Sequence, residues 1–497
     1  MSQLKKGAIL SYITIILTNV IGLVLTPFII RSLGDAEYGL YTLIGAFVGY
    51  ISVMDLGLNN TIIRYVSKYR AEKDKKGEEE FLGTSLIIYF FISILVLLAG
   101  LVFYWNIETI FNQSLTESEL GKAKIMMLIL IFNLMFSLPG GSFTAICNAY
   151  EKFVFPRVLN IVKYIFRSIL VVVILLYGAD SIGLVILDTV INILAILIAY
   201  IYTKRKLNVK YRFRRNNSNS ITEIFSYSIW VFVFAIAYQF QWFAGQTILG
   251  ITANTITVAI YGVGILLGGY YGAFAGAINT LLLPKATKMS VISDSPTEYT
   301  NEMIKIGNIM IFILFLILSG FFLFGKEFIT LWVGSVYLQA WDISMSIMLV
   351  MTLPLVQFFG NSVLEAKKKN KFKAIVSLIT LFIAVIIGYF ASLKYGMYGV
   401  IIPICSAVFL NSILMSFYYN KIFEFQILRF FQTVFLRPII LSAVLILCFK
   451  FLLKYYSLNS WLELLMGIFV FSAVYFALNY FFVFTKTTKQ IIFKNIR

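Results

Sequence analysis

Apolar residues run through this chain in long stretches, and charged residues occur in short groups between them. Each stretch is about 20 residues long, which as a helix crosses the ~30 Å hydrocarbon core of a membrane. The stretches lack the alternation of barrel strands, and only helices or closed barrels satisfy their backbone in lipid. The pattern predicts an all-α polytopic membrane protein with about 14 transmembrane helices. The expected spans are 7–30, 39–58, 81–104, 123–147, 157–177, 182–203, 222–249, 257–283, 303–325, 342–364, 372–392, 398–419, 433–452 and 461–484.

Composition strengthens this prediction, because 60% of the residues are hydrophobic and the mean hydropathy is +0.89. The connecting segments are short, so there is little room for soluble chemistry outside the membrane. The first apolar run is too long for the hydrophobic region of a signal peptide, and no small-residue cleavage site follows it.

Positive charge is distributed unevenly over the two sides of the predicted topology. Of the 41 Lys and Arg residues, 31 lie in the segments on the side of the two termini and seven on the opposite side. This bias orients both termini toward the cytoplasm. The net charge of +18 is therefore a topology signal rather than a sign of a nucleic-acid partner, and attraction to anionic membrane lipids follows from it.

Several kinds of chemistry are disfavoured by what the sequence lacks. There is no histidine, which removes histidine metal ligands, proton relays and nucleophile–histidine pairs. Cys147, Cys405 and Cys448 stand singly in apolar surroundings, as small core residues do. No phosphate-binding GxxxxGK[ST] sequence occurs. We expect no metal, no cofactor and no enzymatic activity.

An internal repeat organises the chain. Four short matches recur in order at offsets of 216, 223, 215 and 218 residues. They are Leu33-Gly34 with Leu249-Gly250, Tyr38-Gly39 with Tyr261-Gly262, Leu138-Pro139 with Leu353-Pro354, and Tyr177-Gly178 with Tyr395-Gly396. An offset of six spans preserves orientation, so we expect two parallel six-helix lobes, 1–205 and 206–425, followed by two further helices in 426–497.

The fifth expected span contains ionisable residues, which are costly in lipid and are candidates for function. Lys163 lies about 10 Å deep and Arg167 about 16 Å deep if the helix starts near Pro156. Asn160 continues the same polar stripe at helical spacing. Asp188 in the next span lies at a comparable depth. The stripe is either the wall of a cationic cavity or, if Arg167 pairs with Asp188, a structural ion pair.

Two further sets of polar residues are candidates. Arg31 ends the first span and Arg64 follows the second, so each either reaches lipid phosphates or lines one mouth of a cationic pathway. Gln239, Gln241 and Trp242 in the seventh span combine hydrogen-bonding groups with an aromatic ring, as sugar-binding surfaces do. Packing between helices is the alternative for this second set.

Carboxylates are scarce within the expected spans, which favours anionic over cationic cargo. A cation-coupled exporter of positively charged drugs is expected to have carboxylates deep in its cavity, and the first and seventh spans have none there. Arginine suits phosphate, because its planar fork donates two parallel hydrogen bonds.

Several motifs resemble those of bacterial polysaccharide-biosynthesis flippases. The first hairpin, Thr26 to Gly34 and on through Glu37-Tyr38-Gly39-Leu40-Tyr41, is the most specific. The other segments that resemble this family are Asp55-Leu56-Gly57-Leu58, Arg64-Tyr65, Asn148-Ala149 and Leu331-Trp332-Val333-Gly334. With length, span count and repeat, the resemblance covers essentially the whole chain.

The resemblance places the chain in the multidrug/oligosaccharidyl-lipid/polysaccharide exporter superfamily. It implies movement of undecaprenyl-pyrophosphate-linked oligosaccharide from the inner to the outer leaflet of the bacterial cytoplasmic membrane, for O-antigen, capsule or other exopolysaccharide. It also implies a central cationic cavity, alternating access, and polymerase and chain-length machinery as partners. Arg31 and Arg64 match positively charged motif positions, whereas Arg167 rests on the depth argument alone.

Other functions predict different properties. A peptidoglycan lipid-precursor flippase predicts neighbouring cell-wall precursor genes, and a cation-coupled multidrug antiporter predicts dependence on a membrane carboxylate. A membrane glycosyltransferase or polymerase predicts a catalytic outer loop with paired carboxylates. A noncatalytic assembly partner predicts no dependence on cargo.

The charge bias makes the topology testable. In a variant without native cysteines, a cysteine at Asn216 should resist an impermeant thiol reagent in intact cells, because this segment lies inside. A cysteine at Asn112 should react. The reverse labelling pattern would overturn the orientation of both termini.

Overall fold

The computed structural model describes residues 3–55, 57–213, 218–279, 282–292, 295–456 and 458–484, with side chains omitted for 3–8, 51–52, 218–231, 274 and 277–279. Asn216 and Leu56, named above, lie outside the described residues. Within these ranges every regular element is a helix, and the predicted all-α class is confirmed. Contacts between Cα atoms divide the chain into two compact units, residues 1–259 with 392–397 and residues 260–391 with 398–497.

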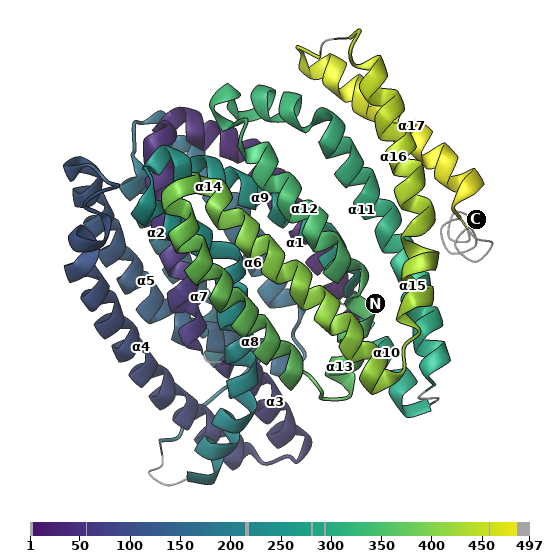
Figure 1. Cartoon of the computed structure of the whole chain (residues 1–497). Coiled ribbons are helices and arrows are strands. Elements are labelled where there is room, and N and C mark those ends of the chain that lie inside the picture. Colours follow the sequence, from purple (N-terminus) through teal and green to yellow (C-terminus); the bar gives the residue numbers. More distant parts are fainter. Residues whose placement is uncertain are drawn as a thin grey trace. The chain divides into compact units, whose positions relative to one another are not determined.

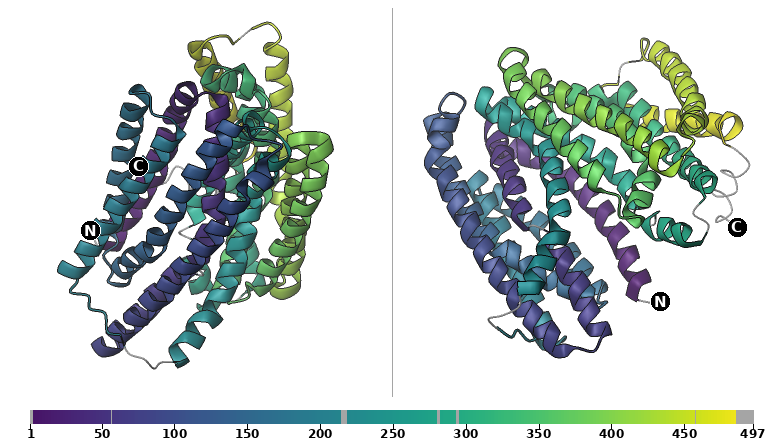
Figure 2. Two further views of the ribbon diagram at one scale, coloured as in Figure 1. Left: turned by 90° about the vertical axis from the view of Figure 1, so that its left-hand side faces the viewer. Right: turned by 60° about the horizontal axis from the view of Figure 1, so that its bottom comes forward.

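The first unit is built from eight α-helices and one short 3-10 helix in the described residues (Figure 1). They are α1 (Gln3–Leu33), α2 (Asp35–Ser52), η1 (Val53–Asp55), α3 (Leu58–Ala71), α4 (Lys75–Phe111), α5 (Glu117–Ala149), α6 (Val154–Leu176), α7 (Ser181–Arg205) and α8 (Ser218–Thr252). Helix α5 packs between α4 and α7, and α6 packs against α1 and α7 (Figures 1 and 2). Helix α2 contacts α1, α5, α7 and α8, so it lies at the centre of this unit.

The second unit contains the remaining helices, apart from short parts of α9 and α14 that belong to the first. They are α9 (Thr255–Asn279), α10 (Leu282–Ile292), α11 (Pro296–Val333), η2 (Ser335–Tyr337), α12 (Ala340–Val356), α13 (Phe358–Ala366), α14 (Lys371–Phe423), α15 (Ile427–Val434), α16 (Leu436–Leu452) and α17 (Trp461–Phe482). Helix α11 is the hub, with α12, α15, α16 and α17 packed along it. Thus α16 and α17, which follow the repeat, are attached to this unit through α11.

The count of about 14 spans is not confirmed. Eleven helices of the described residues are long and apolar enough to cross a membrane, or twelve if α12 and α13, bent by 47°, form one span. Two expected spans, 372–392 and 398–419, lie within the 53-residue α14, which is broken at Gly396 (φ 55°, ψ −133°). The expected span 222–249 corresponds to α8, much of which lies outside the described side chains.

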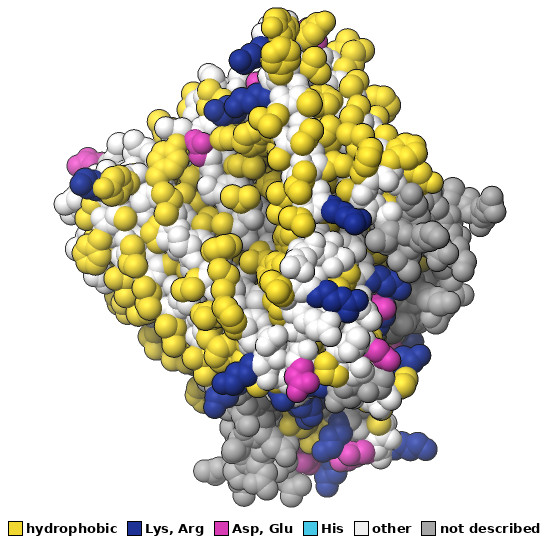
Figure 3. All heavy atoms as spheres, turned by 45° about the vertical axis from the view of Figure 1, so that its right-hand side comes forward, with side chains coloured by type: hydrophobic (Ala, Val, Ile, Leu, Met, Phe, Trp, Pro, Cys, Tyr) yellow, Lys and Arg dark blue, Asp and Glu magenta, His cyan; other side chains and the backbone are white. Residues whose placement is uncertain are grey.

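Large apolar side chains are exposed along the helices, as expected of a surface that faces lipid. Phe90 and Trp105 on α4 are 64% and 70% exposed, and Phe469 on α17 is 73% exposed. Figure 3 shows hydrophobic side chains spread over much of the visible face. This chain is a multi-pass membrane protein.

Between helices, small residues permit close packing. A Cβ on Gly264 would lie 2.6 Å from the Cβ of Ile343, and one on Gly268 would lie 2.7 Å from the Cγ2 of Ile347. Helix α9 therefore packs on α12 through glycines, which is how membrane helices commonly associate.

The internal repeat is visible in the backbone. Gly178 and Gly396, which the repeat aligns, both have positive φ, 83° and 55°. Glu151 and Lys368 also both have positive φ, 57° and 55°. The backbone hydrogen bonds around these two residues run in the same pattern in both halves. The proposed lobe boundaries at 205 and 425 stay predictions.

Pro139 in α5 leaves one carbonyl without its helical donor, and a neighbouring helix supplies it. Proline has no N–H, so the carbonyl of Met135, four residues earlier, loses its intrahelical bond. Ser93 of α4 donates its hydroxyl to that carbonyl at 2.9 Å. This hydrogen bond ties α5 to α4 next to the proline. The hydrocarbon core has no water that could donate to the carbonyl instead of Ser93.

Ser93→Ala should destabilise the protein by about 2 kcal/mol, because it leaves the partly buried Met135 carbonyl without a donor. Unfolding in detergent measures this. Ser85→Ala is the matched control on the same helix. Ser85 donates to Phe81, whose carbonyl keeps its helical partner. Equal losses in the two variants would contradict the assignment.

Candidate functional site

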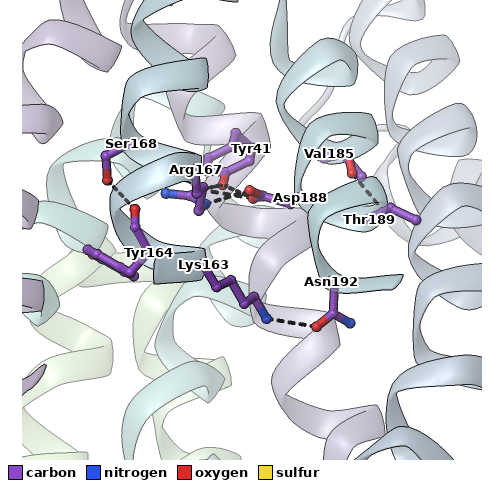
Figure 4. A network of polar contacts seen from close by, with 9 residues as sticks. All are labelled: Tyr41, Lys163, Tyr164, Arg167, Ser168, Val185, Asp188, Thr189 and Asn192. Atoms are coloured by element: carbon purple, nitrogen blue, oxygen red, sulfur yellow. Dashed lines mark hydrogen bonds and ion pairs between the residues drawn. The ribbon is translucent and has the colours of Figure 1, made fainter. Parts of the chain in front are cut away.

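A bidentate ion pair joins α6 to α7 inside the first unit (Figure 4). Arg167 donates from Nε to Asp188 Oδ1 at 2.5 Å and from Nη2 to Oδ2 at 2.9 Å. The Tyr41 hydroxyl of α2 accepts from Arg167 Nη2 at 3.2 Å and donates to Asp188 Oδ2 at 3.1 Å. The two charged side chains are only 21% and 27% exposed. The structural ion pair considered from the sequence is therefore present.

One helical turn away, a second polar contact bridges the same two helices. Lys163 Nζ donates to Asn192 Oδ1 at 2.7 Å. The Asn192 amide nitrogen donates in turn to Asn133 Oδ1 at 2.8 Å and to Ser137 Oγ at 2.5 Å, both on α5. We refer to Tyr41, Asn133, Ser137, Lys163, Arg167, Asp188 and Asn192 together as the α6–α7 ladder.

The stripe predicted on α6 accounts for one side of this ladder. Lys163 and Arg167 are four residues apart, which places them on one face of a helix. Tyr164 donates to the carbonyl of Thr18 on α1 at 3.3 Å, so the polar edge also faces α1. Asn160 is exposed, and within the described residues it makes no contact with the ladder.

The ladder carries a net positive charge. It contains two cations, Lys163 and Arg167, and one carboxylate, Asp188, while its tyrosine and amide groups are neutral. Arg167 is compensated by Asp188, whereas Lys163 is held by a neutral amide. The positive charge that remains is therefore centred on Lys163 and lies between helices of a membrane protein.

Tyr41, Asn133, Ser137 and Asn192 were not predicted as site residues. Asn133, Ser137 and Asn192 are isolated polar residues in apolar runs, which is a usable signal because such residues need partners within the protein. Tyr41 ends the first-hairpin motif. What the sequence does not show is which helix faces which, and that decides the partners.

Arg31 and Arg64 are not part of the ladder. Arg31 lies in the last turn of α1 and is exposed. Arg64 lies on α3, is also exposed, and has its guanidinium 5.7 Å from the centre of the Tyr65 ring. The structure does not bring either residue to Lys163 or Arg167.

The polar residues of α8 separate into two groups. Gln239 is 9% exposed, and its Oε1 has no hydrogen-bond partner in the described residues. A Cβ on Gly49 of α2 would lie 3.0 Å from that oxygen, so Gln239 lies at a contact between helices. Gln241 and Trp242 are partly exposed. The Trp242 ring is 6.2 Å from that of Tyr238, which is 51% exposed.

The first-hairpin motif has a structural role at the ends of α2, α5 and α7. Glu37 accepts from Lys122 Nζ at 2.8 Å and from the Ser181 backbone at 2.9 Å. Lys122 also lies 3.3 Å from Asp180. Burial raises the pKa of Asp180, but the Gly183 amide and Lys122 outweigh it and hold that pKa below its usual range.

Gly39 of the same motif is required by a close approach. A Cβ at this position would lie 1.8 Å from the carbonyl oxygen of Thr255, so any larger residue would collide with that backbone. Thr255 in turn donates to Glu119 Oε1 at 2.8 Å. The motif therefore fixes how α2 meets the start of α9.

Asp55 and Gly57, from the second motif, form the break before α3. Gly57 adopts φ 73°, a left-handed conformation that glycine adopts without strain. The Asp55 carboxylate accepts from the Tyr89 hydroxyl at 2.9 Å and from the Asn59 amide at 3.0 Å. These contacts are structural, since they hold the start of α3 against α4.

The sequence pattern of the family described as polysaccharide biosynthesis protein matches residues 4–285. This chain belongs to that family. The match covers α1 to α9, including the whole ladder.

Two relatives extend the family match along the chain. The chain is 23% identical over 499 residues to the "Uncharacterized membrane protein EpsK" of Bacillus subtilis, covering 95% of this chain and 94% of that one. It is 22% identical over 410 residues to a Shigella flexneri protein named "Putative O-antigen transporter", covering 79% and 92%.

Solved structures show the same fold. The chain is similar to the lipid II flippase MurJ in an inward closed conformation, with a TM-score of 0.74, 17% identity, and 98% and 99% of the two chains covered. It is also similar to an inward-facing multidrug resistance transporter of the MATE family, with a TM-score of 0.62, 14% identity, and 84% and 98% covered. This chain therefore shares the fold of these two solved structures.

The ion pair of the ladder predicts a pattern of stabilities. Arg167→Ala and Asp188→Ala should each cost about 3 kcal/mol, because each leaves a charge in the protein interior without its partner. The double variant should lose less than the sum of the two. Unfolding in detergent measures all three. Lys124→Ala, which breaks an exposed pair with Glu108, is the control and should cost under about 1 kcal/mol. Strict additivity would contradict the pairing.

Proposed function

We propose that this protein is a flippase that moves undecaprenyl-pyrophosphate-linked oligosaccharide units from the inner to the outer leaflet of the bacterial cytoplasmic membrane. The units would then enter cell-surface polysaccharide assembly, with the polymerase and chain-length machinery as partners. One observation carries the proposal: a protein of the polysaccharide biosynthesis family holds a net-positive polar ladder between its membrane helices.

The chemistry of the cargo explains why such a ladder is useful. The head group has two phosphates and a hydrophilic glycan, and both would lose their hydration in hydrocarbon at a high free-energy cost. Cations within the protein lower this barrier by pairing with the phosphates, while the isoprenoid tail stays in lipid. Transport then needs only that cargo binding shifts the equilibrium between inward and outward states.

Within the ladder, Lys163 and Arg167 are proposed to bind the phosphates in different ways. The Lys163 ammonium is bound to a neutral amide and can pair with a phosphate without displacing a counterion. Arg167 contributes its Nε–Nη2 edge to a phosphate only when Asp188 is displaced from it. Arg31 and Arg64, exposed on α1 and α3, are proposed to guide the phosphates at the two mouths. Gln241 and Trp242 on α8 are proposed to contact the glycan.

A peptidoglycan lipid-precursor flippase is the second candidate, because the likeness to MurJ covers 98% of this chain. Both cargoes carry a polyprenyl pyrophosphate, so the ladder suits either. A cation-coupled multidrug antiporter fits less well, since α1 contains no carboxylate. Neighbouring glycosyltransferase and polymerase genes would favour the polysaccharide cargo, and cell-wall precursor genes the alternative.

Export in cells that lack the native gene tests the proposal. Lys163→Ala should reach normal abundance and abolish surface polysaccharide, with lipid-linked units accumulating on the inner leaflet. Lys163→Arg should keep partial export, because it retains the charge. Lys124→Ala is the control and should export normally. Accumulation of a peptidoglycan precursor instead would reassign the cargo.

A double variant separates the two roles of Arg167. If Arg167 contacts the cargo, Arg167→Ala/Asp188→Ala should fail to export at normal abundance. If the residue only neutralises Asp188, removing both charges should restore export. Arg167→Lys should be intermediate in the first case, since it keeps the charge and loses the fork.

A further inference from the structure

The charges of the ladder have a consequence for how the proposed cargo is held. Asp188 occupies the face of Arg167 that a phosphate would use, because both Nε and Nη2 donate to its two oxygens. A phosphate and a carboxylate compete for the same fork geometry. Cargo can therefore gain the Nε–Nη2 edge of Arg167 only by displacing Asp188.

We propose that binding of an anionic lipid pyrophosphate is linked to the uptake of a proton by Asp188. This inference rests on the proposed function. Once a phosphate takes Arg167, the carboxylate is left in a protein interior that is 27% open to solvent at this side chain. A carboxylate without a counterion in such a place is costly, and protonation removes the cost.

The groups around Asp188 do not offer an equivalent replacement for Arg167. Tyr41 of α2 already donates to Asp188, but it is neutral and cannot cancel the charge. On α6, Tyr164 donates to the Thr18 carbonyl. The described contacts of α5 with the ladder come from Asn133 and Ser137, which do not titrate.

Lys163 is the other cation near Asp188, but it binds a different residue, one helical turn away. Its ammonium donates to Asn192, and the bound pyrophosphate, with two charges, calls for both Lys163 and Arg167. If Lys163 moved to Asp188 instead, the cargo would keep one cation and no proton would be needed. This is the rival account, and it predicts binding that does not depend on pH.

The replacement of Asp188 by a phosphate on Arg167 determines how cargo affinity changes with pH. If binding takes up a proton, affinity rises as pH falls, by at most about tenfold per pH unit for one proton. By reciprocity, cargo binding and proton uptake favour each other to the same extent. Asp188→Asn removes the titrating group and leaves two cations, so its binding should be tighter and independent of pH.

The test uses the full chain in lipid nanodiscs and a short-chain polyprenyl-pyrophosphoryl sugar as probe. The pyrophosphate of this probe is esterified at both ends, so its own charge is constant between about pH 6 and about pH 8. Dissociation constants are measured across this range, with sodium replaced by a large organic cation in a parallel series. Asp342→Asn is the control, because Asp342 also accepts from a tyrosine, Tyr398, and lies in the second unit.

The proposal expects the wild type and Asp342→Asn to bind more tightly at low pH, and Asp188→Asn to bind tightly throughout. Wild-type binding that is independent of pH would overturn the linkage and support the Lys163 exchange. Binding that depends on sodium rather than on pH would overturn the assignment of a proton as the linked ion. If the wild type fails to bind the probe at every pH, the proposed function itself fails, which is a distinct result.

Discussion

In the membrane interior, a polar group that finds no partner within the protein finds none at all, and this constraint shapes the first unit. The Ser93 hydroxyl reaches across to the carbonyl that Pro139 leaves open. The ladder residues likewise bond to one another across α2, α5, α6 and α7. In the ladder, the charged groups therefore lie where neighbouring helices complete their contacts.

The same constraint explains how one motif can both fix helix ends and order the ladder. Glu37 and Gly39 lie near the N-terminal end of α2, where Glu37 pairs with Lys122 and Gly39 leaves room for the backbone of Thr255. Two residues further on, Tyr41 bridges Arg167 and Asp188. The hairpin thus fixes the height and rotation of α2, and with them the position of the hydroxyl that orients the ion pair.

The sequence predicted the elements that depend on local pattern. The all-α membrane class, the stripe of Lys163 and Arg167, and Asp188 as the partner of Arg167 were all available from hydropathy and helical spacing. Asn133 and Asn192 were missed, because their role depends on how α5 and α7 are rotated toward α6. Spacing predicted Asn160 on the stripe, but its position near the helix start leaves it exposed. The two spans expected at 372–392 and 398–419 correspond to the two parts of α14, which meet at the non-helical Gly396.

The spacing of the ladder residues also sets the register of α6 against α7. In the antiparallel pair α6 and α7, Arg167 faces Asp188 and Lys163 faces Asn192, one turn apart on each helix. Sliding by one turn, about 5.4 Å, would set Lys163 against Asp188 and leave Arg167 facing Leu184. Sliding the other way would set Asp188 against Val171. Each displaced arrangement buries a charge against an aliphatic side chain, so the intact ladder favours a single register of α6 against α7.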